Sequence, residues 1–384
     1  MKILQITPYF LPYTGGLEQY VFNLSKYLAK RGHHVEVITS NIPIGLKNEE
    51  SNGFSITRLK SYGEPLRNPI IPNILFSLKN LNDYDVINIH SIYALSSIFA
   101  IIKNCQIKTP IVLTHHGKLQ FGTFLNDIIV HFYEVSIAKK ILNNINCSIA
   151  LTTSDANFLS TLGMKRERIR IIPNGIDISE FESFNNLDPL LIRESFGLKN
   201  KFVILYVGVI THRKGIKYLI EAMSEIKNRI SHEKIALLII GTGPELKSIQ
   251  ALVKKMDLEK YIFFKCRVSN LELMRYYKAA SLFVLPSLSE GMPTVILEAF
   301  YFNLPVITTD IPNLRDSFHD MAILVPPKNK SKLAAAILDT FYDNESFNKQ
   351  KLNYKKYIEL NHSWEDLSKQ YEKIYQNLEG QNVK

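Results

Sequence analysis

Cysteine is scarce in this sequence, and its scarcity argues against both a disulfide framework and a zinc site. The three cysteines, Cys105, Cys147 and Cys266, stand far apart in the 384 residues. A small, odd number of widely separated cysteines is typical of a protein kept in a reducing compartment. We therefore expect a cytoplasmic protein without structural disulfides or zinc.

Long hydrophobic runs are also lacking. The longest uncharged apolar run, Ile92–Ile102, falls well short of the roughly 20 residues that a spanning helix needs. The first residues, Lys2–Thr7, have the pattern of a strand and not of a signal peptide. Hydrophobic residues make up 46% and charged residues 21% of the chain, as in folded globular proteins, and the length suits two domains.

Basic residues are numerous but form no dense run. The net charge is +10 and the pI is about 9.2, with the excess spread over both halves. Without a basic arm, we expect no nucleic-acid partner. Attraction to an anionic sugar nucleotide and to an anionic membrane surface both fit the excess. A genomic bias toward Lys, Asn and Ile explains it equally well, and these interpretations stay open.

Apolar, β-branched runs alternate with helical patterns along the chain, which predicts α/β domains with parallel sheets covered on both faces. In residues 1–180 the predicted strands are Lys2–Thr7, His34–Ser40, Val86–His90, Pro110–Thr114, Cys147–Thr152 and Arg170–Pro173. In the second half they are Phe202–Val207, Lys234–Ile240, Ile262–Lys265, Leu282–Leu285, Pro305–Thr309 and Ala322–Val325. Predicted helices include Glu18–Arg31, Gly215–Lys227, Pro244–Met256, Asn270–Ala279 and Ser363–Leu378. The polar stretch Glu180–Asn200 indicates the linker.

The stretch Pro286–Phe300 carries the strongest chemical signal. It follows a buried strand and opens a helix, with Pro293 expected in the first turn. Such a helix start directs free N–H groups to the carboxyl end of the sheet, where open α/β sheets bind phosphate. Glu290 precedes the helix and Glu298 lies inside it. On spacing alone, a dipole-favoured acid and a solvated acid explain the two carboxylates as well as a ligand site does.

The segment Ser289–Thr294, continued by Leu297–Ala299, closely resembles the Glu-x7-Glu signature of glycosyltransferase family 4, whose enzymes have the GT-B fold. With further matches, the resemblance covers nearly the whole chain. It implies two Rossmann-like doubly wound domains facing each other across a cleft. Residues 1–180 with a C-terminal crossover helix, 363–384, would form the acceptor side, and residues 181–362 would bind the nucleotide sugar.

The family resemblance also assigns roles within this stretch. It implies that Glu290 contacts the transferred sugar and that Glu298 holds the ribose. The donor diphosphate would lie at the helix start, formed by Gly291, Met292, Pro293 and Thr294.

A second motif is the loop Pro8–Glu18, which contains Gly15 and Gly16 before a helix. Paired glycines let a backbone approach an anion closely, although a tight turn is the commoner explanation. The loop resembles the opening of the family, and this implies that Gly15 and Gly16 face the donor phosphates and the acceptor.

Adjacent histidines, His115 and His116, end a predicted strand. They fit turn residues as well as a metal ligand, but no third ligand lies at a convincing spacing, so we expect no metal. The family's Thr-x-His-Gly pattern maps onto His116 and implies contact with the donor sugar near the reaction centre. His115 is the alternative if the register differs by one. His116 and Glu290 are therefore the predicted catalytic residues.

The segment Leu205–Gly215 sets Arg213 and Lys214 at a helix start, where a cation would pair with a bound pyrophosphate. Most such pairs are only solvated loop charges. The family has Gly-Arg where this chain has Gly208-Val209, so either Arg213 replaces that charge or Lys214 holds the phosphate alone. Val268 resembles the position whose backbone contacts the base.

Two other patterns are interpreted as structural. Asp83-Tyr84-Asp85 matches the D-x-D metal signature of a different glycosyltransferase fold, but it precedes a strand where family 4 also carries acids. Pro173–Asp177 matches the family's Pro-Asn-Gly-Ile-Asp, a tight turn.

The resemblance implies a retaining, metal-independent glycosyltransferase without a cofactor. A UDP-sugar is the first expectation for the donor and GDP-mannose the second, with a lipid-linked or polysaccharide acceptor. Arg67 and Lys118, in the loops Tyr62–Pro72 and Gly117–Asp127, are the candidate acceptor contacts.

Other interpretations remain. The segment Phe124–Leu142 either packs as a Rossmann helix or lies on an anionic membrane, which would make the protein peripheral on the inner face. A GT-B-fold epimerase or hydrolase, or a catalytically silent nucleotide-binding subunit, are the alternative functions.

Overall fold

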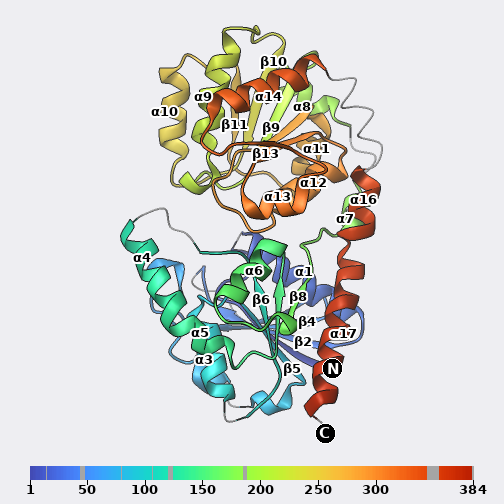
Figure 1. Cartoon of the computed structure of the whole chain (residues 1–384). Coiled ribbons are helices and arrows are strands. Elements are labelled where there is room, and N and C mark those ends of the chain that lie inside the picture. Colours follow the sequence, from blue (N-terminus) through green and yellow to red (C-terminus); the bar gives the residue numbers. More distant parts are fainter. Residues whose placement is uncertain are drawn as a thin grey trace. The chain divides into compact units, whose positions relative to one another are not determined.

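The structure, a computed structural model, describes residues 1–13, 15–43, 48–78, 80–105, 107–119, 124–184, 188–343 and 354–382. The chain forms two compact units: unit 1 is Met1–Gly175 with Trp364–Lys384, and unit 2 is Ile176–Ser363 (Figure 1). The sequence had placed residues 176–180 in the first domain, whereas the structure places them in unit 2. Ile176 donates its backbone N–H to the carbonyl of His362 at 2.8 Å, and Phe181 packs on Tyr301.

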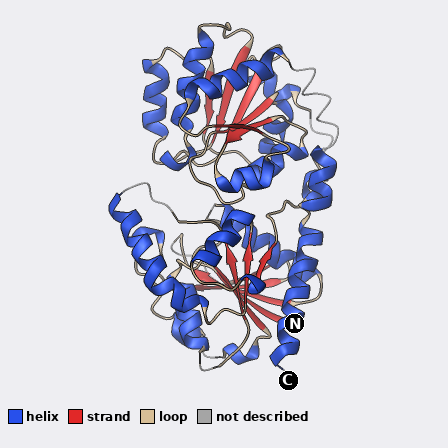
Figure 2. Cartoon of the chain, in the orientation of Figure 1, coloured by secondary structure: helices blue, strands red, loops and turns tan. Residues whose placement is uncertain are grey.

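Unit 1 is built on an eight-stranded sheet in the order β3-β4-β2-β1-β5-β6-β7-β8 (Figure 2). Every strand pair is parallel except β3 with β4. The strands are β1 Lys2–Ile6, β2 His34–Ser40, β3 Glu49–Ser51, β4 Phe54–Leu59, β5 Val86–His90, β6 Ile111–His115, β7 Cys147–Ala150 and β8 Ile169–Ile171. Strands β3 and β4 were not predicted, because β4 alternates buried and half-buried residues and so lacks a continuous apolar run.

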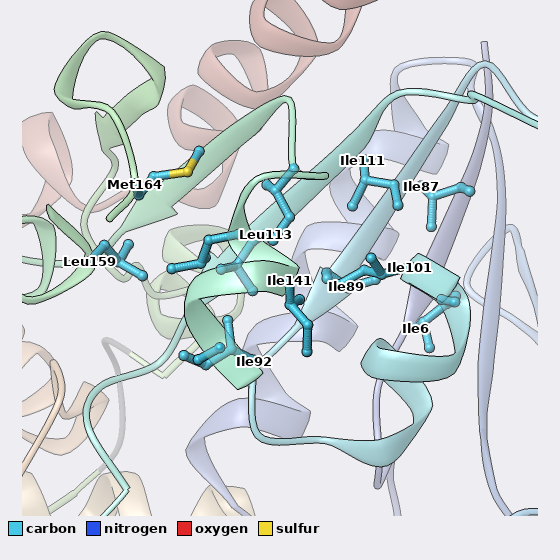
Figure 3. Close-up of a cluster of buried hydrophobic side chains, with 14 of the residues drawn as sticks. Ile6, Ile87, Ile89, Ile92, Ile101, Ile111, Leu113, Ile141, Leu159 and Met164 are labelled. Carbon is cyan, nitrogen blue, oxygen red and sulfur yellow. The ribbon is translucent and has the colours of Figure 1, made fainter. Parts of the chain in front are cut away.

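Helices cover both faces of this sheet. The cluster of buried apolar side chains in Figure 3 joins strand residues such as Ile6, Ile89 and Leu113 to Ile101 of α3 and Leu159 of α6. On the other face, α1 and α17 pack together, and Tyr371 of α17 reaches Thr114 of β6. The elements of unit 1 are α1 Gly16–Lys30, η1 Pro65–Arg67, α2 Ile74–Ser77, η2 Leu81–Asp83, α3 Leu95–Asn104, α4 Phe124–Tyr133, the π-helical turn η3 Glu134–Ala138, α5 Lys139–Leu142, α6 Thr153–Thr161, η4 Arg166–Arg168 and α17 Trp364–Asn382.

Unit 2 has a six-stranded, fully parallel sheet in the order β11-β10-β9-β12-β13-β14. Its strands are β9 Phe202–Val207, β10 Ile235–Ile240, β11 Ile262–Lys265, β12 Leu282–Leu285, β13 Val306–Thr309 and β14 Ile323–Val325. The chain reverses its direction across the sheet between β9 and β12. In unit 1 the corresponding reversal lies between β1 and β5. Ligands of open α/β sheets bind at such switch points.

The helical elements of unit 2 are α7 Ile178–Glu182, α8 Leu190–Ser195, η5 His212–Lys214, α9 Ile216–Lys227, α10 Leu246–Lys255, α11 Asn270–Ala279, α12 Thr294–Tyr301, α13 Pro312–Phe318, α14 Lys330–Tyr342 and α16 Tyr354–Asn361. The predicted linker Glu180–Asn200 is wrong in its described part. It carries α8, buries Leu198 fully and bonds Arg193 to the carbonyl of Lys201 at 3.1 Å. No helix among the described residues is long and apolar enough to cross a membrane.

Candidate active site

The loops that follow β9 and β12 are joined at the switch point of unit 2. Leu288 donates its backbone N–H to the carbonyl of Arg213 at 2.7 Å. Gly215 has φ +64°, and a Cβ at this position would lie 2.0 Å from the carbonyl oxygen of Pro286. Only glycine fits there, so the close approach of the two loops depends on Gly215.

This approach brings Glu290 to two cations. Lys214 Nζ and Ser287 Oγ each donate to Glu290 Oε1 at 2.6 Å, and Arg213 Nη1 donates to Oε2 at 3.2 Å. The Glu290 side chain is 5% exposed. Burial raises the pKa of this carboxyl, but the charges of Lys214 and Arg213 and the two short hydrogen bonds outweigh it, so the pKa is lowered overall. Glu290 is therefore ionised at neutral pH.

Further hydrogen bonds fix the backbone around Glu290. Asn313 of α13 donates its amide to the Glu290 carbonyl at 2.8 Å, and Arg213 donates to the Ser289 carbonyl at 2.7 Å. The Thr309 hydroxyl donates to the carbonyl of Ser287. Roles for Ser287, Asn313 and Thr309 were not predicted from the sequence. Ser287 lies in the same loop as Glu290, whereas Thr309 ends β13 and Asn313 lies in α13.

Helix α12 begins directly after this loop. The sequence had placed Pro293 in the first turn of this helix. In the structure Pro293 is the N-cap, with φ −73° and ψ 124°, and Thr294 opens the first turn. Met292 is buried and Gly291 half-buried beside this helix start. The first N–H groups of a helix have no partner within the helix and favour an anion.

Inside α12, Glu298 is held in place rather than solvated. Tyr277 of α11 donates its hydroxyl to Glu298 Oε2 at 2.7 Å. Burial raises the pKa of Glu298, although hydrogen bonds from Tyr277 and Thr294 oppose the rise. These hydrogen bonds give the Glu298 carboxylate a defined orientation.

The remaining predicted residues of unit 2 lie in loops at the same edge. Val209, which stands where the family has Arg, is 45% exposed, and its carbonyl accepts from the Tyr206 hydroxyl at 3.3 Å. Arg213 already uses its guanidinium on Glu290 and Ser289. Val268 is half-buried in the loop between β11 and α11, next to the Ser269 capping box.

In unit 1, the glycine loop precedes α1. A Cβ on Gly15 would lie 2.2 Å from Glu18 Oε2, whereas a Cβ on Gly16 would meet no atom within 4 Å. Glu18 thus lays its carboxylate over the start of its own helix, and burial raises its pKa to about 7, although a hydrogen bond to its own backbone opposes the rise. The family resemblance implied a bound phosphate at this helix start, and the carboxyl of Glu18 was not predicted to lie there.

The two adjacent histidines face different surroundings. His116 Nε2 lies 3.1 Å from His90 Nδ1, and its ring meets the Tyr20 ring edge-to-face at 4.8 Å. His115 is 1% exposed, stacks on Phe158 and lies 4.0 Å from Asp155 Oδ1. Burial lowers the pKa of His116, and the neighbouring histidines lower it further. His116 is thus a neutral imidazole at neutral pH.

The candidate acceptor contacts differ in how well they are described. Lys118 is 45% exposed, lies 3.4 Å from the buried carboxylate of Glu134 and sits over the Phe158 ring. Glu134, which also accepts from the Tyr93 hydroxyl at 2.8 Å, was not predicted. The Arg67 side chain and residues 120–123 of the second loop lie outside the described part of the structure.

The two patterns interpreted as structural do make structural contacts. Asp85 accepts the backbone N–H of Lys2 at 2.7 Å, and Tyr84 donates to Glu36 at 2.6 Å. Asn174 accepts the N–H of Gly175, and Asp177 caps α7. Among the described residues, no group of three or more His, Cys, Asp or Glu side chains is arranged to hold a metal ion.

Comparison with protein-family models also divides the chain into two parts. Residues 14–180 match the model described as Glycosyltransferase Family 4, and residues 190–376 match Glycosyl transferases group 1. The chain belongs to the GT-B glycosyltransferases. It is therefore an enzyme of glycosyl transfer, and its two parallel-sheet units are the two domains of that fold.

A named glycosyltransferase is similar in sequence, and solved structures share the fold. The alpha-monoglucosyldiacylglycerol synthase of Acholeplasma laidlawii is 26% identical over 325 residues, covering 80% of each chain. The fold is shared with Anabaena Alr3699/HepE in complex with UDP-glucose, at TM-score 0.79 and 18% identity over 98% of this chain and 100% of that one. Sucrose-phosphate synthase from Thermosynechococcus elongatus has TM-score 0.76 and 22% identity over 98% of both chains.

Proposed function

We propose that this glycosyltransferase moves a hexose from a nucleoside diphosphate sugar to a lipid-linked or polysaccharide acceptor, with retention at the anomeric carbon and without a metal ion. The observation that carries the proposal is the cluster of Glu290, Lys214 and Arg213 beside the start of α12. It stands at the switch point of unit 2, where a nucleotide binds in folds of this class.

The charges of this cluster suit a diphosphate. Two cations and one carboxylate leave one positive charge, and the helix start adds a partial positive charge. In the proposed reaction, Lys214, the α12 N–H groups and Gly16 stabilise the charge that develops on the departing diphosphate. Donors fixed before the reaction perform this stabilisation without reorganisation.

The remaining site residues would orient the donor. Glu298, held by Tyr277, would accept hydrogen bonds from the ribose hydroxyls. Glu290 would contact the transferred sugar near the anomeric carbon, with its carboxylate kept ionised by Lys214. His116 would contact hydroxyls of the same sugar. A phosphate oxygen of the leaving group would take the acceptor proton, so retention needs no protein base.

The choice of donor and acceptor is supported by the similar proteins. The UDP-glucose in the Anabaena structure supports a UDP-sugar as first choice, with GDP-mannose second. The name of the Acholeplasma relative supports a lipid acceptor.

The decisive experiment combines binding and turnover. Thermal shifts with UDP-, GDP- and ADP-sugars name the donor. Product release is then measured with and without diacylglycerol and polyprenyl-linked acceptors, in EDTA and in Mg²⁺, and NMR reports the anomeric configuration of the product. We expect acceptor-dependent release of UDP that EDTA leaves unchanged. Donor conversion without acceptor would indicate a hydrolase or an epimerase, binding without turnover would indicate a silent subunit, and loss of activity in EDTA would overturn the metal-independent mechanism.

We also propose that unit 1 touches an anionic membrane through α4 and η3. Their outward side chains are Leu125, Ile128, Ile129, Phe132 and Val135, which are 49–74% exposed. Exposed Lys139 and Lys140 follow on α5. An apolar helix face bordered by lysines is typical of helices that lie in the membrane interface.

Co-sedimentation with vesicles tests the membrane contact. We expect binding to phosphatidylglycerol vesicles to exceed binding to phosphatidylcholine vesicles and to fall several-fold in Phe132→Glu. Tyr342→Glu is the matched control, because Tyr342 is an equally exposed aromatic residue of unit 2 (70% against 69%). Equal binding by wild type and Phe132→Glu would contradict the proposal.

A further inference from the structure

His90 is a buried histidine that the proposed reaction does not yet use. It ends β5 at the switch point of unit 1 and has no exposed surface. Its ring lies between two other polar side chains. Nε2 is 2.8 Å from Gln5 Oε1, and Nδ1 is 3.1 Å from His116 Nε2.

The chemistry of the Gln5 side chain fixes which atom donates in each of these hydrogen bonds. The Gln5 carbonyl oxygen can only accept, so His90 must carry its proton on Nε2. The Asn88 amide nitrogen also approaches His90 Nε2, but at 3.5 Å, and this weaker contact does not compete with the 2.8 Å bond. His90 Nδ1 therefore presents a lone pair, and His116 must donate to it from Nε2.

Neither His90 nor His116 carries a second ring proton at neutral pH. Burial lowers the pKa of His90 to about 3, and the pKa of His116 is lowered as well. Each imidazole thus holds one proton at neutral pH, and its two nitrogens have opposite roles.

We propose that His90 and Gln5 are positioning residues that hold His116 in the Nε2–H form, so that its Nδ1 is a fixed acceptor for a substrate hydroxyl. Within the described residues, His116 Nδ1 has no hydrogen-bond partner. The ring is also held in orientation by Tyr20, whose hydroxyl lies 2.5 Å from that of Tyr371. This inference rests on the proposed contact between His116 and the donor sugar.

A fixed acceptor has a consequence for specificity. A hydroxyl can donate to Nδ1, whereas a fluorine or a methoxy group at the same carbon cannot. The sugar hydroxyl that contacts His116 should therefore tolerate neither replacement, because the bound sugar would leave the Nδ1 lone pair without a donor. A histidine in the opposite form, with its proton on Nδ1, could instead donate a hydrogen bond to a fluorine or to an ether oxygen.

The direct test is long-range ¹H–¹⁵N NMR of the full chain with ¹⁵N-labelled histidine at pH 7.5, without substrate. We expect His90 and His116 both to be protonated on Nε2 and unprotonated on Nδ1. If Gln5 presents its amide N–H₂ to His90 instead, the assignment reverses along the whole relay, and a proton on His116 Nδ1 would overturn the proposal. This readout needs no catalytic activity, so it stands or falls separately from the proposed function.

Variants then test whether the relay sets the form of His116. His90→Leu removes the acceptor of the His116 Nε2 proton, so His116 should become a mixture of its two neutral tautomers. His90→Gln can present a carbonyl oxygen to His116 and should restore the single Nε2–H form. If His90→Leu fails to fold, Gln5→Leu replaces it as the test. This variant removes the acceptor of the His90 Nε2 proton, so it should also give a mixture of the two His116 forms. His115→Leu, which removes another buried imidazole at the same strand end, should leave His116 unchanged. The same shift in His115→Leu would indicate a general packing effect and overturn the relay.

Turnover adds a second readout. His90→Leu should lower kcat/KM on the order of tenfold, the value of one well-oriented hydrogen bond, while the Kd of the bare nucleotide stays unchanged. His90→Gln should recover most of the loss. An unchanged kcat/KM in His90→Leu would mean that the form of His116 does not matter for the reaction. Absence of turnover in wild type together with the expected NMR result would instead remove the proposed function and leave the relay intact.

Discussion

The sheets of the two units have their switch points in corresponding places, between β1 and β5 and between β9 and β12. The side chains at the two switch points differ in charge. In unit 2 the side chains at the switch point are charged and paired, with Glu290 between Lys214 and Arg213. In unit 1 the histidines there are neutral: His90 and His116 share a hydrogen bond, and the Tyr20 ring packs edge-to-face on His116. Paired charges suit the diphosphate end of a sugar nucleotide, and neutral donors and acceptors suit sugar hydroxyls.

Burial acts in opposite ways on the two networks. In unit 2, Lys214 and Arg213 outweigh the cost of burial and lower the pKa of Glu290, so this buried carboxylate stays ionised. In unit 1 burial dominates and lowers the pKa of His90 and His116, so charge is kept out. Desolvation is common to both, and the presence or absence of an opposite charge decides the outcome.

The largest effect should come from removing the charge of unit 2. Glu290→Gln keeps a side chain of the same shape that can still accept from Lys214 and Ser287, but it removes the negative charge. If the carboxylate stabilises positive charge near the anomeric carbon, kcat should fall on the order of 10²–10³-fold, as for other preorganised electrostatic groups. Steady-state kinetics with saturating donor measures this.

Glu259→Gln is the control for this prediction, since Glu259 is an exposed carboxylate of the same unit. Its kcat should match wild type. A Glu290→Gln enzyme, or a Glu290→Ala enzyme, that keeps full turnover would remove Glu290 from the chemistry and would leave the contrast between the two units without a catalytic meaning.

The fold was largely predictable because its strands are buried on both faces. Continuous apolar runs predicted β1, β2 and β5 in unit 1 and every strand of unit 2 to within a residue or two. The exceptions have physical reasons. Strand β4 alternates buried with half-buried residues, and α8 lies in a stretch whose polar composition indicated a linker.

The site was predictable only where its residues follow one another in the chain. The loop from Ser289 to Thr294 and the pair Arg213–Lys214 could be found because a family motif spans them. The His90 relay could not, because Gln5 and His90 meet through the parallel pairing of β1 with β5. The available signal was a polar residue within each apolar strand, since a buried polar group requires a partner.

A smaller effect, on stability, should separate the units by pH. Two fully buried histidines of unit 1 have lowered pKa values, His90 at about 3 and His115 at about 4, and the pKa values of the half-buried His33 and His116 are lowered as well. The unfolded chain takes up these protons below its pKa of about 6.5 and the folded unit does not, so stability is lost as pH falls from about 6.5 toward about 4. At pH 5 this amounts to about 2 kcal/mol for His90 and about the same for His115.

Carboxylates modify this loss without cancelling it. Glu18, with its pKa raised to about 7, binds a proton in the folded state earlier than in the unfolded one and so adds stability as pH falls from 7 toward 4.5. In unit 2, Glu298 acts in the same direction, while the stability that Glu290 contributes is lost only below the ordinary glutamate pKa. Between pH 6.5 and 5, acid should therefore weaken unit 1 and spare unit 2.

The single tryptophan allows the units to be followed separately. Trp364 belongs to unit 1, is fully buried and packs on Tyr20 at 4.7 Å. The urea midpoint of its fluorescence should fall between pH 7 and pH 5, and His90→Gln should reduce that dependence by the share of one histidine. Amide exchange in β9 and β12, corrected for the intrinsic rate, should show no matching loss of protection. A tryptophan midpoint that stays constant over this range would mean that the histidines of unit 1 can be protonated in place, and neutrality would then not be what distinguishes unit 1 from unit 2.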